Sequence, residues 1–153
     1  MKHVKDTYAS QGTGFSEKRD CSVRAAATAS GLPYEHVHAV FAKHGRKPKR
    51  GTPTAVSIDA HREMFKSEPQ RGERLTVAEF VRRNPIGRYV LHVRGHALAV
   101  VDGAVHDWSY GPRRRVRLYW WIPETEKPAD DINEKIIAAL EEQKRLLTIL
   151  AKA

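Results

Sequence analysis

The sequence predicts one α+β fold in which helices come first and an antiparallel sheet follows. Before residue 84, apolar residues recur three to four positions apart, which is the spacing of helices that bury one face. Between residues 87 and 122 they alternate with polar residues, as in strands. The dipeptide Asp102-Gly103 separates two apolar runs and favours a two-residue hairpin turn. We therefore expect a four-stranded antiparallel meander with the N-terminal helices packed on it.

Local start and stop signals predict four helices in the first half. Asp20 is a good N-cap for an alanine-rich helix, and Gly31 is a good residue to end it. Thr76 and Glu79 form the pattern of a capping box before a short helix. The expected helices span about residues 21–30, 33–44, 53–66 and 77–83.

Four alternating segments follow, and a last helix ends the chain. The expected strands span residues 87–94, 96–101, 104–109 and 113–122. Pro123 and Pro128 bracket a linker, and Asp130 or Asp131 is expected to cap an amphipathic helix over 131–151. This division gives a folded domain over 1–123 and a linker with a C-terminal helix over 124–153. The helix is expected to pack back on the sheet or to mediate self-association.

The composition limits the classes of function. The chain of 153 residues carries 27 Lys and Arg against 18 Asp and Glu, a formal net charge of +9. Such a charge favours an acidic protein or a nucleic acid as partner. No apolar segment is typical of a signal peptide or of a membrane span, so we expect no membrane partner. A single cysteine and the lack of an export signal indicate a cytoplasmic protein.

The hairpin register places a histidine beside an aspartate. Counting outward from the Asp102-Gly103 turn puts His96 and Asp107 on one face as diagonal neighbours, within reach of a hydrogen bond. His106 and Trp108 fall on the opposite face, and Trp108 is expected in the core. An imidazole held by a carboxylate is the base of many nucleophilic sites.

Cys21 is the candidate nucleophile for this base. It lies in the first turn of the expected helix over 21–30, where partial positive charge and free N–H groups stabilise a thiolate. Alternatively, Cys21 is a small core residue and His96 a sheet histidine bonded to a carbonyl. His92 and His96 have the spacing of a helical zinc pair, but Gly95 and the strand pattern disfavour a helix there. We expect no metal and no cofactor.

These residues resemble the papain-like cysteine peptidases, and most closely the C39-like peptidases. Asp20-Cys21 opens a helix, Gly95-His96 opens a strand, and Asp107 follows on the next strand, which is the family order of Cys, His and Asp. The resemblance covers roughly residues 10–122. It implies a papain-like core in which Cys21 is the nucleophile, His96 the general base and Asp107 the residue that orients it.

The oxyanion hole departs from the family pattern. C39-like and other papain-like peptidases usually carry a Gln about six residues before the cysteine, where this chain has Phe15. Gln11 is the one Gln that precedes Cys21 in the sequence, and it is our candidate oxyanion residue. The C-terminal helix lies outside the family core.

The sequence therefore predicts a papain-like cysteine hydrolase that cleaves an amide bond in a protein or peptide substrate; peptidase, deamidase and acyl-transfer chemistry all stay open. The alternative is an inactive papain-like binding module whose basic surface engages nucleic acid or an acidic protein. A phage-encoded protein that acts in the bacterial host cytoplasm is a third possibility.

The candidate residues for binding nucleic acid or an acidic protein are the basic cluster that precedes the aromatic run 119–121: Arg113, Arg114, Arg115 and Arg117. The same cluster could instead protect an edge strand from aggregation.

Overall fold

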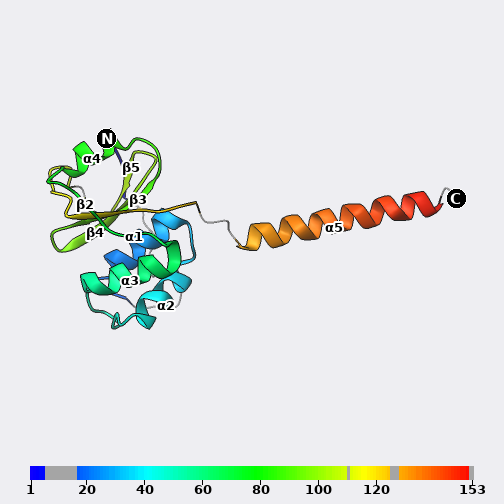
Figure 1. Ribbon diagram of the computed structural model, residues 1–153, viewed down its shortest axis with the longest axis horizontal. Helices are drawn as coiled ribbons and strands as arrows, with labels where there is room; N and C mark the ends of the chain where they lie inside the picture. The colour runs from blue at the N-terminus through cyan, green and yellow to red at the C-terminus, as the bar shows by residue number, and fades with distance from the viewer. Residues whose placement is uncertain (6–16, 110, 125–127, 152–153) are drawn as a thin grey trace.

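The computed structural model describes residues 1–5, 17–109, 111–124 and 128–151, and for residues 128–134 it describes the backbone alone. Within these residues the fold is α+β, with five helices and one six-stranded mixed sheet (Figure 1). The expected fold class is confirmed at this level. The elements in chain order are β1 (Lys2–Val4), α1 (Cys21–Ser30), α2 (Tyr34–Lys43), α3 (Thr54–Phe65), β2 (Gln70–Arg71), α4 (Val77–Arg83), β3 (Arg88–Val93), β4 (His96–Val101), β5 (Ala104–His106), β6 (Leu118–Trp121) and α5 (Pro128–Ala151).

Helix α1 has the bounds that the sequence predicts. Gly31 ends it with a left-handed backbone, φ 75°, and its N–H donates to the Ala27 carbonyl. Asp20 stands at the N-cap position, but the expected side-chain cap is wrong. Its buried carboxylate instead accepts a hydrogen bond of 2.8 Å from the Tyr34 hydroxyl and lies 3.0 Å from Arg24 Nε. These two partners take the place of the backbone N–H groups of the first turn.

Of the later helices, α4 begins as the sequence predicts and α5 does not. Thr76 and Glu79 form the expected capping box at the start of α4. Helix α5 begins at Pro128, so the expected cap at Asp130 or Asp131 is wrong. Proline is favoured in the first turn because it lacks the N–H that has no helical acceptor there.

The central hairpin has the predicted register. Val100 pairs with Val105 and Val101 with Ala104, and the strands are antiparallel. Asp102 and Gly103 both have positive φ, 47° and 78°, as a type I′ turn requires.

The expected meander is confirmed for β3, β4 and β5, which pair in sequence and antiparallel, but it is wrong for β6. The strand order is β1-β5-β4-β3-β6-β2, so the last strand, β6, returns to pair with β3 and does not continue beyond β5. The free edge of β5 is taken by β1, which runs parallel to it and lies in a segment expected to be a loop. Strand β2 covers the outer edge of β6, so β6 is not an edge strand.

Two clusters of buried side chains pack on opposite faces of the sheet. Helices α1, α2 and α3 contribute to one, and the small alanine side chains of α1 let that helix lie close to β4 and β3. Helix α4 contributes Val77, Phe80 and Val81 to the other. The first residues of α1 and of β4 are therefore held in place by a closely packed core.

Helix α5 stands apart from the sheet and the other helices (Figure 1). Its apolar side chains from residue 136 onward are at least half exposed, and Leu150 is 70% exposed. The expectation that this helix packs back on the sheet is therefore wrong. None of the described helices is long and apolar enough to cross a membrane.

Candidate active site

Helix α1 and strand β4 begin at the same place, and this brings Cys21 to His96. Cys21 is the first residue of α1, His96 the first residue of β4, and the two elements pack against each other. Cys21, His96 and Ala97 line one cleft, and interactions of the sulfur with the His96 side chain and the Ala97 backbone lower the pKa of the thiol. Two residues that are 75 positions apart in the sequence thus form one pair.

The second nitrogen of His96 is held by a buried carboxylate. Nε2 lies 2.7 Å from Oδ1 and 2.9 Å from Oδ2 of Asp107, which is almost fully buried. Because Nε2 faces Asp107, Nδ1 is the nitrogen left to face the thiol. The predicted grouping of Cys21, His96 and Asp107 is therefore present in the structure.

The pKa values of the pair shift in opposite directions. Burial alone raises the pKa of the Cys21 thiol, but the hydrogen bonds from His96 and Ala97 outweigh it, and the net shift is downward. Burial alone lowers the pKa of His96, but the bonds to Asp107 and Cys21 outweigh it and raise the pKa to about 9. Both shifts move the pair toward a thiolate beside an imidazolium, compared with an isolated cysteine and histidine.

The N-terminal strand fixes Asp107. The Asp107 backbone N–H donates to the Val4 carbonyl at 3.0 Å, and the ring of His3 lies 2.9 Å from the Asp107 carbonyl. The Ser109 hydroxyl donates to Oδ2 at 3.1 Å. The carboxylate that orients His96 is therefore held by β1 and by the turn after β5, and the sequence alone did not indicate the role of β1.

Trp108 lies against the His96 ring, next to the His96–Asp107 hydrogen bond. Its ring stacks edge-to-face on the His96 ring, with centroids 4.9 Å apart, and the Arg24 guanidinium lies 4.9 Å from the Trp108 ring centroid. Trp108 is 41% exposed, so its expected place in the core is wrong. The chain leaves the strand after His106, and the alternation of faces ends there.

A buried carboxylate fixes the segment that leads into α1. Glu17 accepts hydrogen bonds of 2.6 Å from His38 and from the Lys49 backbone N–H, and it pairs with Arg46. Burial alone raises the pKa of Glu17, but these bonds lower it to about 2. The ion pair ties the approach to Cys21 to the end of α2 and the loop after it.

A cleft of about 490 Å³ opens at the Cys21–His96 pair. Trp108 and Arg19 lie on its wall, and Thr54 and His92 lie where it continues toward α3 and β3. At the start of α1, the Cys21 N–H is one of the amides that have no acceptor within the helix. Such a donor can stabilise an oxyanion formed on a substrate carbonyl. Gln11, the candidate second donor, lies outside the described residues.

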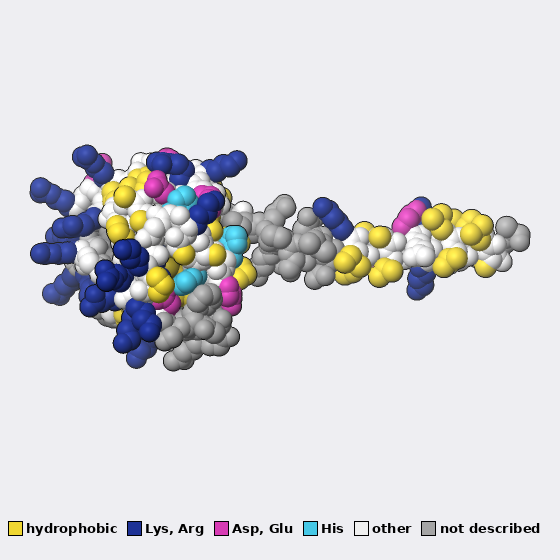
Figure 2. All heavy atoms as spheres, turned by 90° about the horizontal axis from the view of Figure 1, so that it is seen from below, with side chains coloured by type: hydrophobic (Ala, Val, Ile, Leu, Met, Phe, Trp, Pro, Cys, Tyr) yellow, Lys and Arg dark blue, Asp and Glu magenta, His cyan; other side chains and the backbone are white. Residues whose placement is uncertain are grey.

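The predicted basic cluster is only partly assembled around one site. Arg115 and Arg117 line a second pocket beside the cleft, together with Arg71 and Arg74, which the sequence analysis missed. Arg114 lines a smaller pocket with Arg115, Arg117 and Arg94. Arg113 is exposed and lines neither of these two pockets. Figure 2 shows many Lys and Arg side chains on the surface of the part that contains the sheet and the N-terminal helices.

No protein-family model, curated protein or solved structure matches the chain. Among the described residues, no three His, Cys, Asp or Glu side chains are grouped so that they could hold a metal ion. The chemistry of the site is therefore argued from its own geometry: an activated thiol, a base oriented by a carboxylate, and a free amide donor beside an open cleft.

Proposed function

We propose that the protein is a papain-like cysteine hydrolase that cleaves an amide bond in a peptide or protein. The observation that carries this proposal is the Cys21 thiol at the start of α1, in one cleft with the His96 imidazole, whose Nε2 lies 2.7 Å from buried Asp107. A structural cysteine has no need of a base, and a structural histidine has no need of a buried orienting carboxylate. Perturbed pKa values of this kind are typical of functional sites.

The reaction follows from the positions of these groups. The Cys21 thiolate attacks the carbonyl carbon, and the oxyanion accepts a hydrogen bond from the Cys21 N–H. The C–N bond breaks, and the amine leaves with the proton from His96 Nδ1. His96 then takes a proton from water, which attacks the thioester and releases the acid and the thiolate. Asp107 keeps the imidazole in one tautomer and stabilises its charged form.

The second candidate function is an inactive papain-like module that binds nucleic acid or an acidic protein. The arginines beside the cleft favour it, and so does Phe15 at the position where the related peptidases carry Gln. The shifted pKa values of Cys21 and His96 favour hydrolysis instead, because a binding module gains nothing from an activated thiol.

Alkylation of Cys21 tests the reactivity on which the proposal depends. Iodoacetamide at pH 6.5 is expected to modify Cys21 about tenfold faster than free cysteine, because a larger fraction is thiolate. His96→Ala is expected to remove this advantage. His106→Ala, a half-buried histidine on the same hairpin, serves as the matched control and keeps it. Equal rates in the wild type, His96→Ala and free cysteine would contradict the proposal.

Turnover is tested with a diverse peptide mixture analysed by mass spectrometry. The wild type is expected to produce new termini or deamidated products, and Cys21→Ser is expected to produce none. Products that persist in Cys21→Ser, or a reactive thiol with no product from any peptide, would favour the binding module.

A further inference from the structure

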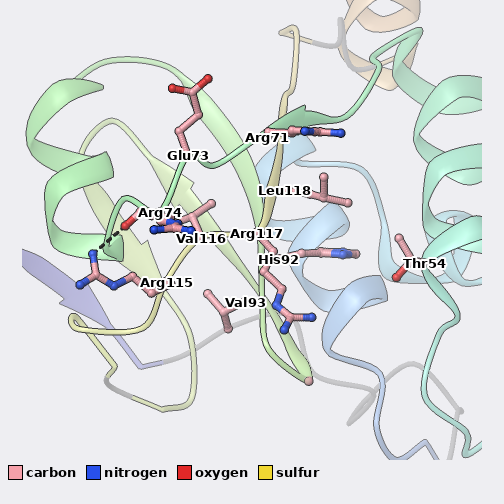
Figure 3. Close-up of a pocket in the computed structure, with 11 residues that line it drawn as sticks. Thr54, Arg71, Glu73, Arg74, His92, Val93, Arg115, Val116, Arg117 and Leu118 are labelled. Atoms are coloured by element: carbon pink, nitrogen blue, oxygen red, sulfur yellow. Dashed lines mark hydrogen bonds between the residues drawn. The ribbon is translucent and has the colours of Figure 1, made fainter.

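A second pocket, of about 750 Å³, opens beside the catalytic cleft and shares part of its wall. The residues that line both are Thr54, His92, Val93 and Gly95. Figure 3 shows this pocket, which we call the arginine pocket, between the loop before α4 and the segment that enters β6. A ligand in the cleft can therefore continue into the arginine pocket without leaving the surface.

The arginine pocket carries an excess of positive charge. Arg71, Arg74, Arg115 and Arg117 line it, against one carboxylate, Glu73. In Figure 3 the Glu73 carboxylate points away from His92 and Thr54. Among the described residues, none of the four guanidinium groups forms an ion pair; Arg115 donates to the Arg74 carbonyl, a neutral partner, at 2.6 Å. The charge of this pocket is thus left for a ligand.

The sheet fixes how far this charge lies from the reacting atoms. Val93 on β3 is paired with His96 on one side, and the Arg117 N–H donates to the His92 carbonyl on the other. Arg117 and His96 are therefore separated by one strand, a distance of about 10 Å between backbones. An extended peptide covers this distance in about three residues.

The chemistry of the cleft selects the kind of anion. A thiol hydrolase needs an acyl carbon, which a peptide supplies and a nucleic acid does not. Sites for single-stranded nucleic acid combine basic residues with exposed aromatic rings on which bases stack. The arginine pocket contains the His92 imidazole but no Phe, Tyr or Trp side chain among its described lining residues. Both observations favour an acidic peptide.

We propose that the arginine pocket is the specificity site of the hydrolase and takes a Glu or Asp side chain about three residues from the scissile amide. This inference rests on the proposed function. The guanidinium groups of Arg71, on β2, and Arg117, directly before β6, bind the carboxylate. Arg115 is held behind them as a fixed positive charge.

Thiol-directed peptide probes test the inference. Short peptides carry a chloroacetyl group at the N-terminus or a chloromethyl ketone at the C-terminus, with Glu, Gln or Lys at the second to fourth position from the electrophile. In one of the two sets, the Glu probe is expected to inactivate the wild type about tenfold faster than the Gln probe at low salt. The Lys probe is expected to be the slowest.

Charge reversal identifies the residues responsible. Arg117→Glu and Arg71→Glu are expected to abolish the preference for Glu, and Arg117→Glu to favour Lys. Arg82→Glu on α4 makes the same change of net charge at an exposed site outside the arginine pocket, and it is expected to keep the preference. The rate of alkylation by iodoacetamide, a small neutral reagent, is measured in each variant, and the probe rates are divided by it, so that a change in the reactivity of Cys21 is separated from a change in charge preference.

Two results would overturn the inference. One is an equal rate for the Glu and Gln probes in both sets. The other is a single-stranded oligonucleotide that protects Cys21 better than a Glu-rich peptide of the same charge, with the protection lost in Arg117→Glu, since this would identify a nucleic-acid site.

Failure of the proposed function gives a different result. In that case iodoacetamide modifies Cys21 no faster than free cysteine, and the inference is judged by fluorescence polarisation of a labelled Glu-rich peptide. Binding that Arg117→Glu weakens and Arg82→Glu does not would retain the acidic ligand, and equal binding to both variants would exclude it.

Discussion

His96 and Asp107 are joined through one ring nitrogen: Nε2 lies 2.7 and 2.9 Å from the two carboxylate oxygens. This bond fixes the ring, leaves Nδ1 for Cys21, and supports the charged form of the imidazole. The backbone of Asp107 is itself held by β1, through the Val4 carbonyl and the His3 ring, so the geometry of the pair depends on this edge of the sheet.

Removing the negative charge of Asp107 is expected to lower the fraction of Cys21 that is thiolate at a given pH. Asp107→Asn keeps an oxygen acceptor but no longer stabilises the imidazolium, so the acidic limb of the alkylation rate against pH moves up by about 1 pH unit. The matched control is Asp102→Asn, which makes the same change of charge at the turn of the same hairpin. The role of Asp107 is contradicted if both variants keep the wild-type profile.

Trp108 is expected to affect the alkylation rate of Cys21 through its contact with the His96 ring. Trp108→Ala opens the His96–Asp107 bond to water and removes the edge-to-face contact, which lowers the alkylation rate about three- to tenfold. Trp108→Phe keeps an aromatic ring at this position and is expected to restore most of the rate. A full rate in Trp108→Ala shows that the ring is a surface residue with no effect on the base.

His61 is expected to make the fold sensitive to acid. Its ring is fully buried against Phe41, Phe65 and Trp120, and burial, followed by the charge of His92, lowers its pKa to about 3. Between the usual pKa of 6.5 and about 3, the unfolded chain binds a proton that the folded protein does not. The free energy of unfolding therefore falls as the pH falls through this window, by about 1.4 kcal/mol per pH unit from His61 alone.

Urea unfolding between pH 7 and pH 4 measures this effect. His61→Phe removes the titrating group and is expected to flatten the dependence, whereas the exposed His36→Gln is expected to leave it unchanged. A dependence as steep in His61→Phe as in the wild type would assign the acid sensitivity to other groups.

Helix α5 is expected to associate with a second copy of itself. Five positions alternate at spacings of four and three, as in a coiled coil: Ile136, Leu140, Gln143, Leu147 and Leu150. The apolar members of this set are at least half exposed. Sedimentation is expected to give a multiple of 17.3 kDa for the wild type and a monomer for Leu140→Glu. Ala138→Glu, on the opposite side of α5, keeps the oligomer; a monomeric wild type contradicts the prediction.

The sequence predicted those parts of the fold that depend on neighbouring residues. The end of α1 follows from Gly31, the start of α4 from the capping box of Thr76 and Glu79, and the hairpin register from Asp102-Gly103, because caps and turns are local features. The meeting of Cys21 with His96 was expected from this register and from the resemblance to the papain-like peptidases.

The errors concern contacts between distant or very short segments. Strand β1 has three residues and β2 has two, too few for an alternating pattern, so the sequence did not indicate that β1 holds Asp107 or that Arg71 lies beside the cleft. The face of Trp108 was misjudged because strand periodicity was extended past His106, where the strand ends.

The pKa of the Cys21 thiol tests the central claim most directly. Thiolate absorbance is measured against pH as the difference between the protein and Cys21→Ser, which removes the contribution of the tyrosines. The account predicts a pKa below the usual value of 9.0 in the wild type and in His106→Ala. In His96→Ala it predicts a higher pKa than in the wild type, because the bond and the positive charge of His96 are lost while burial still raises the pKa. A thiol that titrates at or above its usual pKa in the wild type, with no change in His96→Ala, would contradict it.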